Sequence, residues 1–221
     1  SIVFLGAILA RTGRAVLSFP GGCELGPRPI DLHLQALRRM GARIVEDYGC
    51  LSCSAEGPLH GAAIGLSFPS VGATENVMLA AVLAEGTTVV TNAAREPEIC
   101  DLADFLNRCG ARVSGAGGST LVIEGVRSLH GCEHRVIPDR IAAATFMSAA
   151  AATGGCIRLN QVIPAHLEPV IPSFEELGCS IEIEDTSLRI SAPARLGRVK
   201  SVRTMPYPGF ATDLQQPLTP L

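Results

Sequence analysis

The sequence predicts a mixed α/β (α+β) fold, built from one supersecondary unit that recurs along the chain. Glycines that end predicted helices are evenly spaced: Gly41, Gly110 and Gly178 are 69 and 68 residues apart, and Gly86 and Gly154 are 68 residues apart. The order of amphipathic helix, strand pair, apolar helix and single strand also recurs. A period near 68 residues is too long for a solenoid repeat. We therefore expect small subdomains, each with two helices and about four strands, in which helices pack on a sheet.

Hydrophobic periodicity locates the individual elements. The helix over 32–40 has Leu37 and Met40 at helical spacing, whereas those over 76–84 and 141–152 are nearly all apolar, which predicts burial on all sides. A glycine follows shortly after each predicted helix, as is typical of helix C-termini. Helices are expected over residues 1–10, 32–40, 76–84, 99–109, 141–152 and 167–177, and strands over 15–19, 43–47, 50–55, 87–91, 112–114, 120–123 and 156–160.

Composition and charge give no sign of a nucleic-acid-binding or membrane protein. The 221 residues are 47% hydrophobic but 4% aromatic, so the core must consist of Ala, Val, Leu and Ile. The net charge of −3 gives no reason to expect a nucleic-acid or membrane partner. Lys200 is the sole lysine, so an anionic ligand would be held by individually placed arginines. The longest apolar runs, 2–10 and 141–147, are too short to span a membrane.

The eight cysteines do not have the spacing of a metal site. Cys50-x-x-Cys53 has no second such pair, and Cys132-x-His134 is too tight for a zinc finger. Most of the cysteines lie in apolar runs, as Cys156 does, so we expect buried, reduced thiols in a cytoplasmic protein. The cysteines are Cys23, Cys50, Cys53, Cys100, Cys109, Cys132, Cys156 and Cys179.

Neither end has the pattern of a natural terminus. Ser1 runs directly into an apolar segment without a Met or a basic leader. The last residues, Pro217–Leu221, stop without a terminating pattern. We therefore expect this sequence to be a piece of a longer chain.

A stretch rich in Gly and Pro, Gly21–His33, carries the most reactive side chains. Its composition excludes a regular helix or a central strand and predicts a loop, with Cys23 near its tip and a helix beginning near Asp31. A thiol five residues before the guanidinium of Arg28 can act as an acid or nucleophile beside an anion-binding group. The alternative interpretation is a surface turn with an incidental cysteine.

Three loop-to-helix junctions occupy matching places in the repeat: Pro69–Thr74, Pro138–Arg140 and Pro208–Asp213. Each would present free backbone N–H groups and the positive end of a helix to a ligand. One interpretation is that the three helix ends converge on a phosphorylated ligand. The simpler one is ordinary N-capping, by Thr74, by Asp139 and by Thr212 or Asp213.

The loop, the repeat and the junctions contain a set of ordered motifs. They are Pro20–Cys23, Gly26–His33, Pro69–Asn76, Asn92–Ile99, Pro138–Ile141 and Pro206–Gln215. Together these motifs resemble the UDP-N-acetylglucosamine 1-carboxyvinyltransferases, which are enolpyruvyl transferases of bacterial peptidoglycan synthesis. The resemblance runs from end to end of this sequence but covers only the middle of the family's chain.

This resemblance implies the enolpyruvyl transferase fold, an alpha-beta prism of repeated β-α-β-α-β-β subdomains in two lobes around a cleft. Residues 1–137 would form part of the lobe that carries the catalytic loop, and residues 138–221 part of the second lobe. The implied reaction transfers the enolpyruvyl group from phosphoenolpyruvate to the 3′-hydroxyl of UDP-N-acetylglucosamine and releases phosphate, in the first committed step of peptidoglycan synthesis. It takes place in the cytoplasm and uses no cofactor and no metal.

The resemblance also implies three catalytic residues. Cys23 matches the family's general acid, which can carry a covalent phosphoenolpyruvate adduct and is the target of fosfomycin. Arg28 matches a loop arginine that contacts both substrates, and Asp213 matches the acid proposed as base toward the 3′-hydroxyl. Because a carboxylate with an ordinary pKa is a weak base for an alcohol, this step needs a concerted transfer or a raised pKa.

Two segments match the family's nucleotide-binding positions. The first would line the uridine pocket with Pro29, Ile30, Asp31 and Leu32. The second would hold the diphosphate with the backbone N–H groups of Ser70, Val71 and Gly72. Just before this second segment, Phe68 replaces the lysine that some members carry, as in another branch of the family.

Five further residues match charged or polar positions of the family. His33 is a possible ligand contact, with a helix-start residue as the alternative. Asp139 and Arg140 match an interdomain pair near the cleft, and the alternative is a helix cap with a surface ion pair. Glu96 and Glu98 match acids of a characteristic loop, and we expect them to be structural.

The family's other substrate-binding residues lie in N- and C-terminal segments that this sequence lacks. We therefore expect the full-length protein to be the enzyme and the chain as given to be inactive or nearly so. Two alternatives stay open. One is a non-catalytic or truncated remnant that keeps the fold, and the other is a sibling enolpyruvyl transferase that acts on shikimate 3-phosphate.

Overall fold

The computed structural model describes residues 2–19 and 29–221, so the tip of the predicted catalytic loop lies outside the described residues. The chain forms two compact units, residues 1–135 and 136–221. The predicted assignment of 1–137 and 138–221 to two lobes of a larger enzyme stays a prediction.

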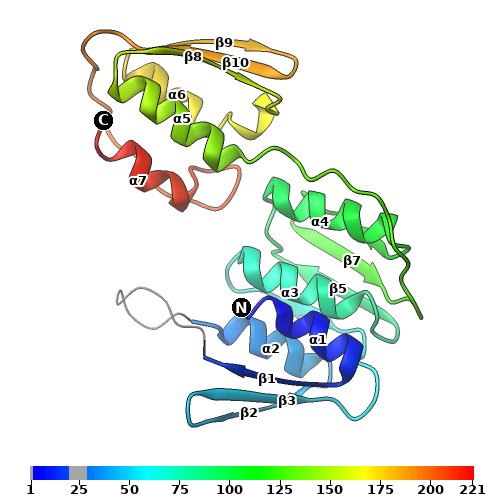
Figure 1. Cartoon of the computed structure of the whole chain (residues 1–221). Coiled ribbons are helices and arrows are strands. Elements are labelled where there is room, and N and C mark those ends of the chain that lie inside the picture. The colour runs from blue at the N-terminus through cyan, green and yellow to red at the C-terminus, as the bar shows by residue number, and fades with distance from the viewer. Residues whose placement is uncertain (1, 20–28) are drawn as a thin grey trace. The chain divides into compact units, whose positions relative to one another are not determined.

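The first unit opens with a helix, a strand, a second helix and a hairpin (Figure 1). Helix α1 (Phe4–Thr12) leads into strand β1 (Arg14–Ser18). Helix α2 (Asp31–Arg39) precedes the hairpin of β2 (Arg43–Asp47) and β3 (Cys50–Ser54). Strand β3 pairs antiparallel with both neighbours, so the sheet order is β1-β3-β2.

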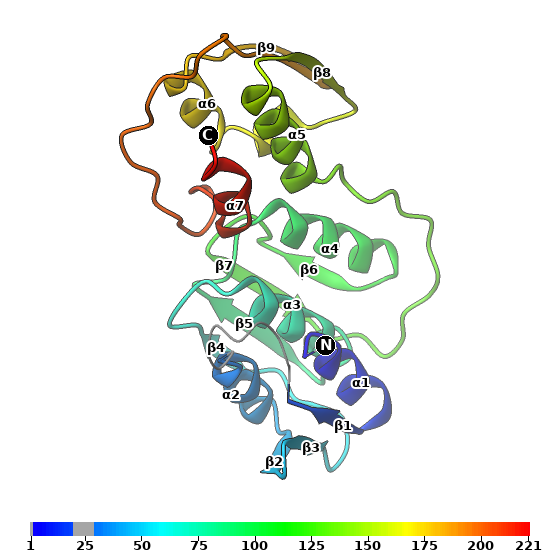
Figure 2. The same ribbon diagram turned by 60° about the vertical axis from the view of Figure 1, so that its left-hand side comes forward.

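The middle repeat also lies in the first unit and has the complete order β-α-β-α-β-β that the resemblance implied. Its sheet runs β4-β5-β7-β6, with β4 parallel to β5 and the other pairs antiparallel. Figure 2 shows helices α3 and α4 beside this sheet. The elements are β4 (Ala63–Gly65), α3 (Val71–Ala81), β5 (Thr87–Thr91), α4 (Pro97–Arg108), β6 (Arg112–Ser114) and β7 (Thr120–Glu124).

The second unit repeats the helix, strand, helix and hairpin order around the sheet β8-β10-β9. A segment without regular structure then leads to the short helices that end the chain. The elements are α5 (Arg140–Ala152), β8 (Cys156–Asn160), η1 (Pro164–His166), α6 (Ile171–Glu176), β9 (Ser180–Glu184), β10 (Ser187–Ser191), η2 (Thr212–Leu214) and α7 (Gln215–Leu218).

The structure confirms the repeat that the glycine spacing predicted. In all three sheets, the second strand of the hairpin lies between the first hairpin strand and the single strand before it. Gly41, Gly110 and Gly178 follow α2, α4 and α6 with φ angles of 97°, 95° and 90°. Because this left-handed conformation is strained for residues with a Cβ, each glycine lets the chain turn from its helix into the hairpin.

Each unit has its own hydrophobic core. In the first, α1 and α3 pack closely, and Leu5 and Met78 are fully buried there. In the second, α5 and α6 cover one face of the sheet, with Phe174, Met147 and Leu188 at the centre. Among the residues that the structure describes, the first core contains no buried aromatic side chain, as the composition predicted, whereas the second also contains the rings of Phe174 and Phe210.

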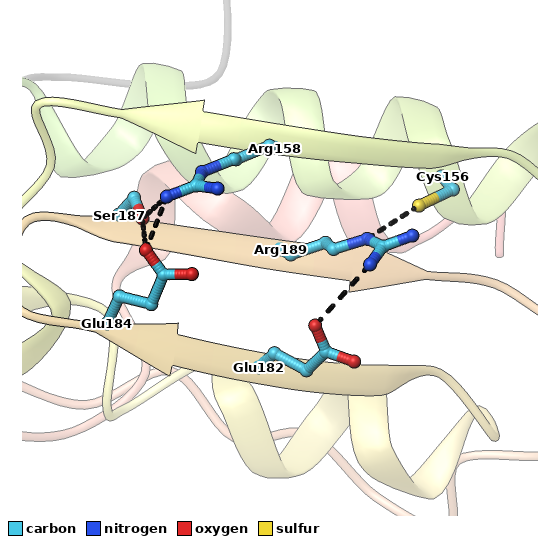
Figure 3. Close-up of polar contacts among 6 residues, drawn as sticks. All are labelled: Cys156, Arg158, Glu182, Glu184, Ser187 and Arg189. Atoms are coloured by element: carbon cyan, nitrogen blue, oxygen red, sulfur yellow. Dashed lines mark hydrogen bonds and ion pairs between the residues drawn. The ribbon is translucent and has the colours of Figure 1, made fainter.

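The outer face of the sheet in the second unit is polar (Figure 3). Nε of Arg189 lies 3.3 Å from Sγ of Cys156, and the same guanidinium pairs with Glu182 at 3.6 Å. Arg158 pairs with Glu184. Cys156 is a free, exposed thiol on this face, and hydrogen bonds from Ser191 and Arg189 lower its pKa. The prediction that Cys156 is buried in an apolar run was wrong, because strand alternation turns its side chain to the polar face.

Some predicted boundaries were also wrong. The helix predicted over 76–84 begins at Val71, and the helix predicted over 167–177 is the shorter α6, which begins at Ile171. The prediction missed the strands β4, β9 and β10. In the part of the chain that the structure describes, no helix is both long and apolar enough to cross a membrane.

Candidate functional site

The predicted uridine-binding segment lies at the start of α2. Ile30 precedes the helix and is 8% exposed, so it anchors the segment to the core, and Leu32 packs partly against the same core. Pro29 and Asp31 are exposed on either side of Ile30. The segment thus presents Pro29 and Asp31 to solvent from a fixed backbone.

The predicted diphosphate-binding turn forms the start of α3. Ser70 is the N-cap, and its Oγ accepts a hydrogen bond from the N–H of Ala73 at 3.3 Å. Thr74 was predicted as the cap, which is wrong: its hydroxyl donates to the carbonyl of Ser70 at 2.8 Å and accepts from the N–H of Ala94 at 3.1 Å. Within residues 2–19 and 29–221, the N–H groups of Val71 and Gly72 have no hydrogen-bond partner. This helix end therefore keeps donors for a ligand.

His33 joins these two segments. A Cβ built on Gly72 would lie 3.2 Å from Cε1 and 3.5 Å from Nε2 of His33, so the imidazole lies against the first turn of α3. His33 is 7% exposed, and burial lowers its pKa, an effect that Asp31 partly opposes. A neutral imidazole thus lies beside the free N–H groups of the α3 N-terminus.

Asn76 is the residue of this site that the sequence analysis did not single out. It lies on α3 one turn after Gly72, is fully buried, and its Nδ2 is 3.0 Å from Nδ1 of His33. The signal that could have revealed it is its position in a helix predicted to be nearly all apolar, since a buried amide requires hydrogen-bond partners.

The start of α5 differs from that of α3. Oδ1 of Asp139 accepts hydrogen bonds from the N–H groups of Ile141 at 2.8 Å and Ala142 at 3.0 Å, so Asp139 is the N-cap, as one of its two interpretations predicted. The guanidinium of Arg140 lies over the ring of Tyr207, with Cζ 5.5 Å from the centroid.

Asp213 lies in η2 of the second unit. Its side chain is exposed, between the buried residues Phe210 and Leu214 that anchor the turn. Neither Thr212 nor Asp213 caps this helix, because the N-cap is Ala211 and makes no side-chain bond. A cavity of about 620 Å³ in the same unit, lined by Arg198 and Arg203 among others, does not include Asp213 in its lining.

In the first unit the structure brings together the start of α3, at Ser70 and Gly72, and the side chain of His33. The predicted residues Asp139, Arg140 and Asp213 lie in the second unit. Cys23 and Arg28 lie outside the described residues. Glu96 is the N-cap residue of α4 and Glu98 lies in its first turn, positions suited to the structural role predicted for both. Across residues 2–19 and 29–221, no three His, Cys, Asp or Glu side chains are arranged to hold a metal ion.

The family model described as EPSP synthase (3-phosphoshikimate 1-carboxyvinyltransferase) matches residues 1–220. The chain belongs to this family. It is 54% identical over 215 residues to UDP-N-acetylglucosamine 1-carboxyvinyltransferase 1 of Symbiobacterium thermophilum. It is 50% identical over 215 residues to UDP-N-acetylglucosamine 1-carboxyvinyltransferase 2 of Caldanaerobacter subterraneus subsp. tengcongensis. These matches cover 97% of this chain but 48% and 51% of the relatives, so the chain spans about half their length.

Solved structures show the same fold. The enolpyruvyl transferase NikO of Streptomyces tendae matches with a TM-score of 0.80 and 23% identity, over 98% of this chain and 52% of its own. EPSP synthase of Acinetobacter baumannii matches with a TM-score of 0.65 and 24% identity, over 100% of this chain and 51% of its own. The predicted enolpyruvyl transferase fold and the resemblance to this family are confirmed.

Proposed function

We propose that the complete protein containing this chain transfers the enolpyruvyl group of phosphoenolpyruvate to the 3′-hydroxyl of UDP-N-acetylglucosamine and releases phosphate. The observation that carries the proposal is the 54% and 50% identity, over 97% of the chain, to two relatives that bear this activity in their names. The reaction would serve peptidoglycan synthesis in the cytoplasm. The seven described cysteines are free thiols, which is consistent with that compartment.

The start of α3 supports the choice of a nucleoside diphosphate as ligand. The free N–H groups of Val71 and Gly72 and the positive end of the helix favour a phosphate group there. His33 adds an imidazole edge at the same place without adding a positive charge. Pro29 and Asp31 lie exposed at the start of the neighbouring helix, where they would contact the uridine.

The chemistry assigns one role to each predicted catalytic residue. The thiol of Cys23 delivers a proton to C3 of phosphoenolpyruvate while the 3′-oxygen of the sugar bonds to C2 and its proton passes to Asp213. In the second step the thiolate of Cys23 takes a proton back from C3, the bond from C2 to the phosphate oxygen breaks, and inorganic phosphate departs. Arg28 would balance the negative charge of phosphoenolpyruvate. Asp213 is exposed, so it is open to solvent and to substrate.

The second candidate function is transfer to shikimate 3-phosphate. It is favoured by the family description and by the fold shared with EPSP synthase. However, an identity of 24% to that structure supports the fold alone, and the relatives with 50% or more identity are named for the nucleotide sugar.

The decisive experiment measures phosphate release by the complete protein. We expect release from phosphoenolpyruvate with UDP-N-acetylglucosamine and none with shikimate 3-phosphate. The Cys23→Ala variant should lose this activity, and fosfomycin in the presence of the nucleotide sugar should alkylate Cys23, as located by mass spectrometry. Release with shikimate 3-phosphate alone would establish the second candidate, and no release with either acceptor would indicate a non-catalytic remnant.

A further inference from the structure

Asn76 is an unusual residue for its place in the fold. It is 0% exposed and lies in α3, whose other buried residues are mostly apolar. A buried amide is costly unless its acceptor and donors are hydrogen-bonded. Its partners come from α1 and α2, which Figures 1 and 2 both show beside α3.

The start of α1 fixes the orientation of the Asn76 amide. Oδ1 accepts a hydrogen bond from the backbone N–H of Gly6 at 2.6 Å, and Nδ2 donates to the carbonyl of Ile2 at 3.0 Å. If the amide were flipped, Nδ2 would face the N–H of Gly6 and Oδ1 would face the carbonyl of Ile2, and neither pair could form a hydrogen bond. Nδ2 is therefore also the donor in its other contact.

That other contact fixes the tautomer of His33. Nδ2 of Asn76 lies 3.0 Å from Nδ1 of His33, so Nδ1 accepts with its lone pair. Burial lowers the pKa of the ring, and Asp31, on the same helix, is the charged group that acts in the opposite direction. A neutral ring whose Nδ1 is an acceptor carries its proton on Nε2.

Nε2 of His33 lies close to the first turn of α3. A Cβ on Gly72 would be 3.5 Å from Nε2, and in the described ranges 2–19 and 29–221 this nitrogen has no hydrogen-bond partner. The N–H groups of Val71 and Gly72 lie at the same end of α3. A hydrogen on Nε2 adds a third donor to these two, whereas a lone pair there would repel an anion.

We propose that Asn76 is a positioning residue, which holds His33 as the neutral Nε2–H tautomer so that the ring donates to an anionic group at the N-terminus of α3. The nature of that anion, the diphosphate of a nucleotide, rests on the proposed function. Asn76 itself does not touch the ligand, because it is buried between α1 and α2.

The first test observes the wild-type ring directly. Nitrogen-15 NMR of the histidine rings in the whole 221-residue chain distinguishes a protonated from an unprotonated ring nitrogen. We expect His33, identified by its loss in His33→Gln, to show an unprotonated Nδ1 and a protonated Nε2 at neutral pH. An Nδ1–H tautomer, or a charged ring at neutral pH, would overturn the proposal.

The second test uses Asn76→Asp, which keeps the acceptor for Gly6 and the size of the side chain but replaces Nδ2, the donor to His33 and to the carbonyl of Ile2, by an oxygen. Above the pKa of His33, Nδ1 should then carry the proton and Nε2 should lose it. We expect UDP to bind about tenfold more weakly than to the wild type at about pH 8. At a pH low enough to protonate the ring, the charged imidazole donates from both nitrogens and the affinity should recover.

Asn107→Asp is the matched control. Asn107 also bonds backbone groups within the first unit, at Val113, but does not contact His33. This variant should leave both the His33 spectrum and the pH profile of UDP binding unchanged. A loss of affinity in Asn76→Asp that is equal at both pH values would mean a merely structural role. If the wild type shows the expected tautomer but UDP does not bind, the proposed function fails and the tautomer assignment stands.

Discussion

Helices α3 and α5 begin at equivalent places in the repeat but with different chemistry. Each follows a proline and one capping residue: Pro69 and Ser70 before α3, Pro138 and Asp139 before α5. The cap of α3 is neutral and binds one N–H, whereas the cap of α5 is a carboxylate that binds two. The α5 terminus thus supplies its own anion, and the α3 terminus stays open to one from outside.

The two helices also differ at one interior position. The repeat places Thr145 where α3 has Asn76, and Thr145 is exposed and donates to the carbonyl of Ile141 in its own helix. Asn76 instead ties α3 to His33. Two differences therefore distinguish the start of α3, the proposed ligand site, from that of α5: a neutral cap, and a buried amide bonded to a neighbouring side chain.

Giving α3 the cap of α5 should have the largest effect. In Ser70→Asp the new carboxylate would bind the free N–H groups of α3 and repel a phosphate, so we expect UDP affinity to fall about a hundredfold while the helix content stays unchanged. Calorimetric titration and circular dichroism measure the two quantities. Ser70→Asn, a neutral cap, is the control and should keep most of the affinity. Equal affinity in Ser70→Asp would show that the anion does not bind at this helix end.

A smaller perturbation acts on the contact between α3 and His33. In Gly72→Ala the new Cβ would lie 3.2 Å from Cε1, so the ring must move away from the helix end. We expect about tenfold weaker UDP binding with little change in stability, because Ala favours the helix as Gly does not. Gly131→Ala, whose Cβ would meet no atom within 4 Å, is the control. Undiminished UDP binding in Gly72→Ala would place the ligand away from His33.

The sequence predicted the repeat well because helix-ending glycines are local signals that need no tertiary context. It placed the start of α3 too late, since Val71 and Gly72 have low helix propensity and the cap at Ser70 overrides it. The hairpin β9–β10 was missed because its turn contains no glycine, although Ile181 and Ile183 alternate with charged residues as in a strand.

The site was predictable only in part. The resemblance to the family named Ser70, Gly72 and His33, but not that the ring of His33 packs against Gly72. The hydrogen bond between Asn76 and His33 joins residues 43 positions apart, and it depends on how α2 packs against α3. Local patterns do not encode such a contact.

Removing the charged cap of α5 should cost stability in the second unit. Asp139→Ala loses two hydrogen bonds to N–H groups, so we expect the helix to lose about 1 kcal/mol, while Asp139→Asn keeps the cap and should lose little. Because the chain has two units, amide hydrogen exchange of Ile141 and Ala142 is a better measure than a single melting temperature. Unchanged exchange in Asp139→Ala would show that the cap does not stabilise α5.

The smallest expected effect concerns a charge that α3 has and α5 lacks, since the repeat places Ala144 where α3 has Glu75. Burial raises the pKa of Glu75, and repulsion from Glu98 and Glu96 raises it further by smaller amounts. The folded chain then binds more protons than the unfolded chain between the ordinary pKa of glutamate and the raised one, so this residue lowers stability as pH rises through that window. The first unit of Glu75→Gln should therefore melt at a higher temperature than that of the wild type at neutral pH, and the difference should disappear below the ordinary glutamate pKa. A difference that does not depend on pH would mean that size or hydrogen bonding, and not charge, sets the cost of Glu75.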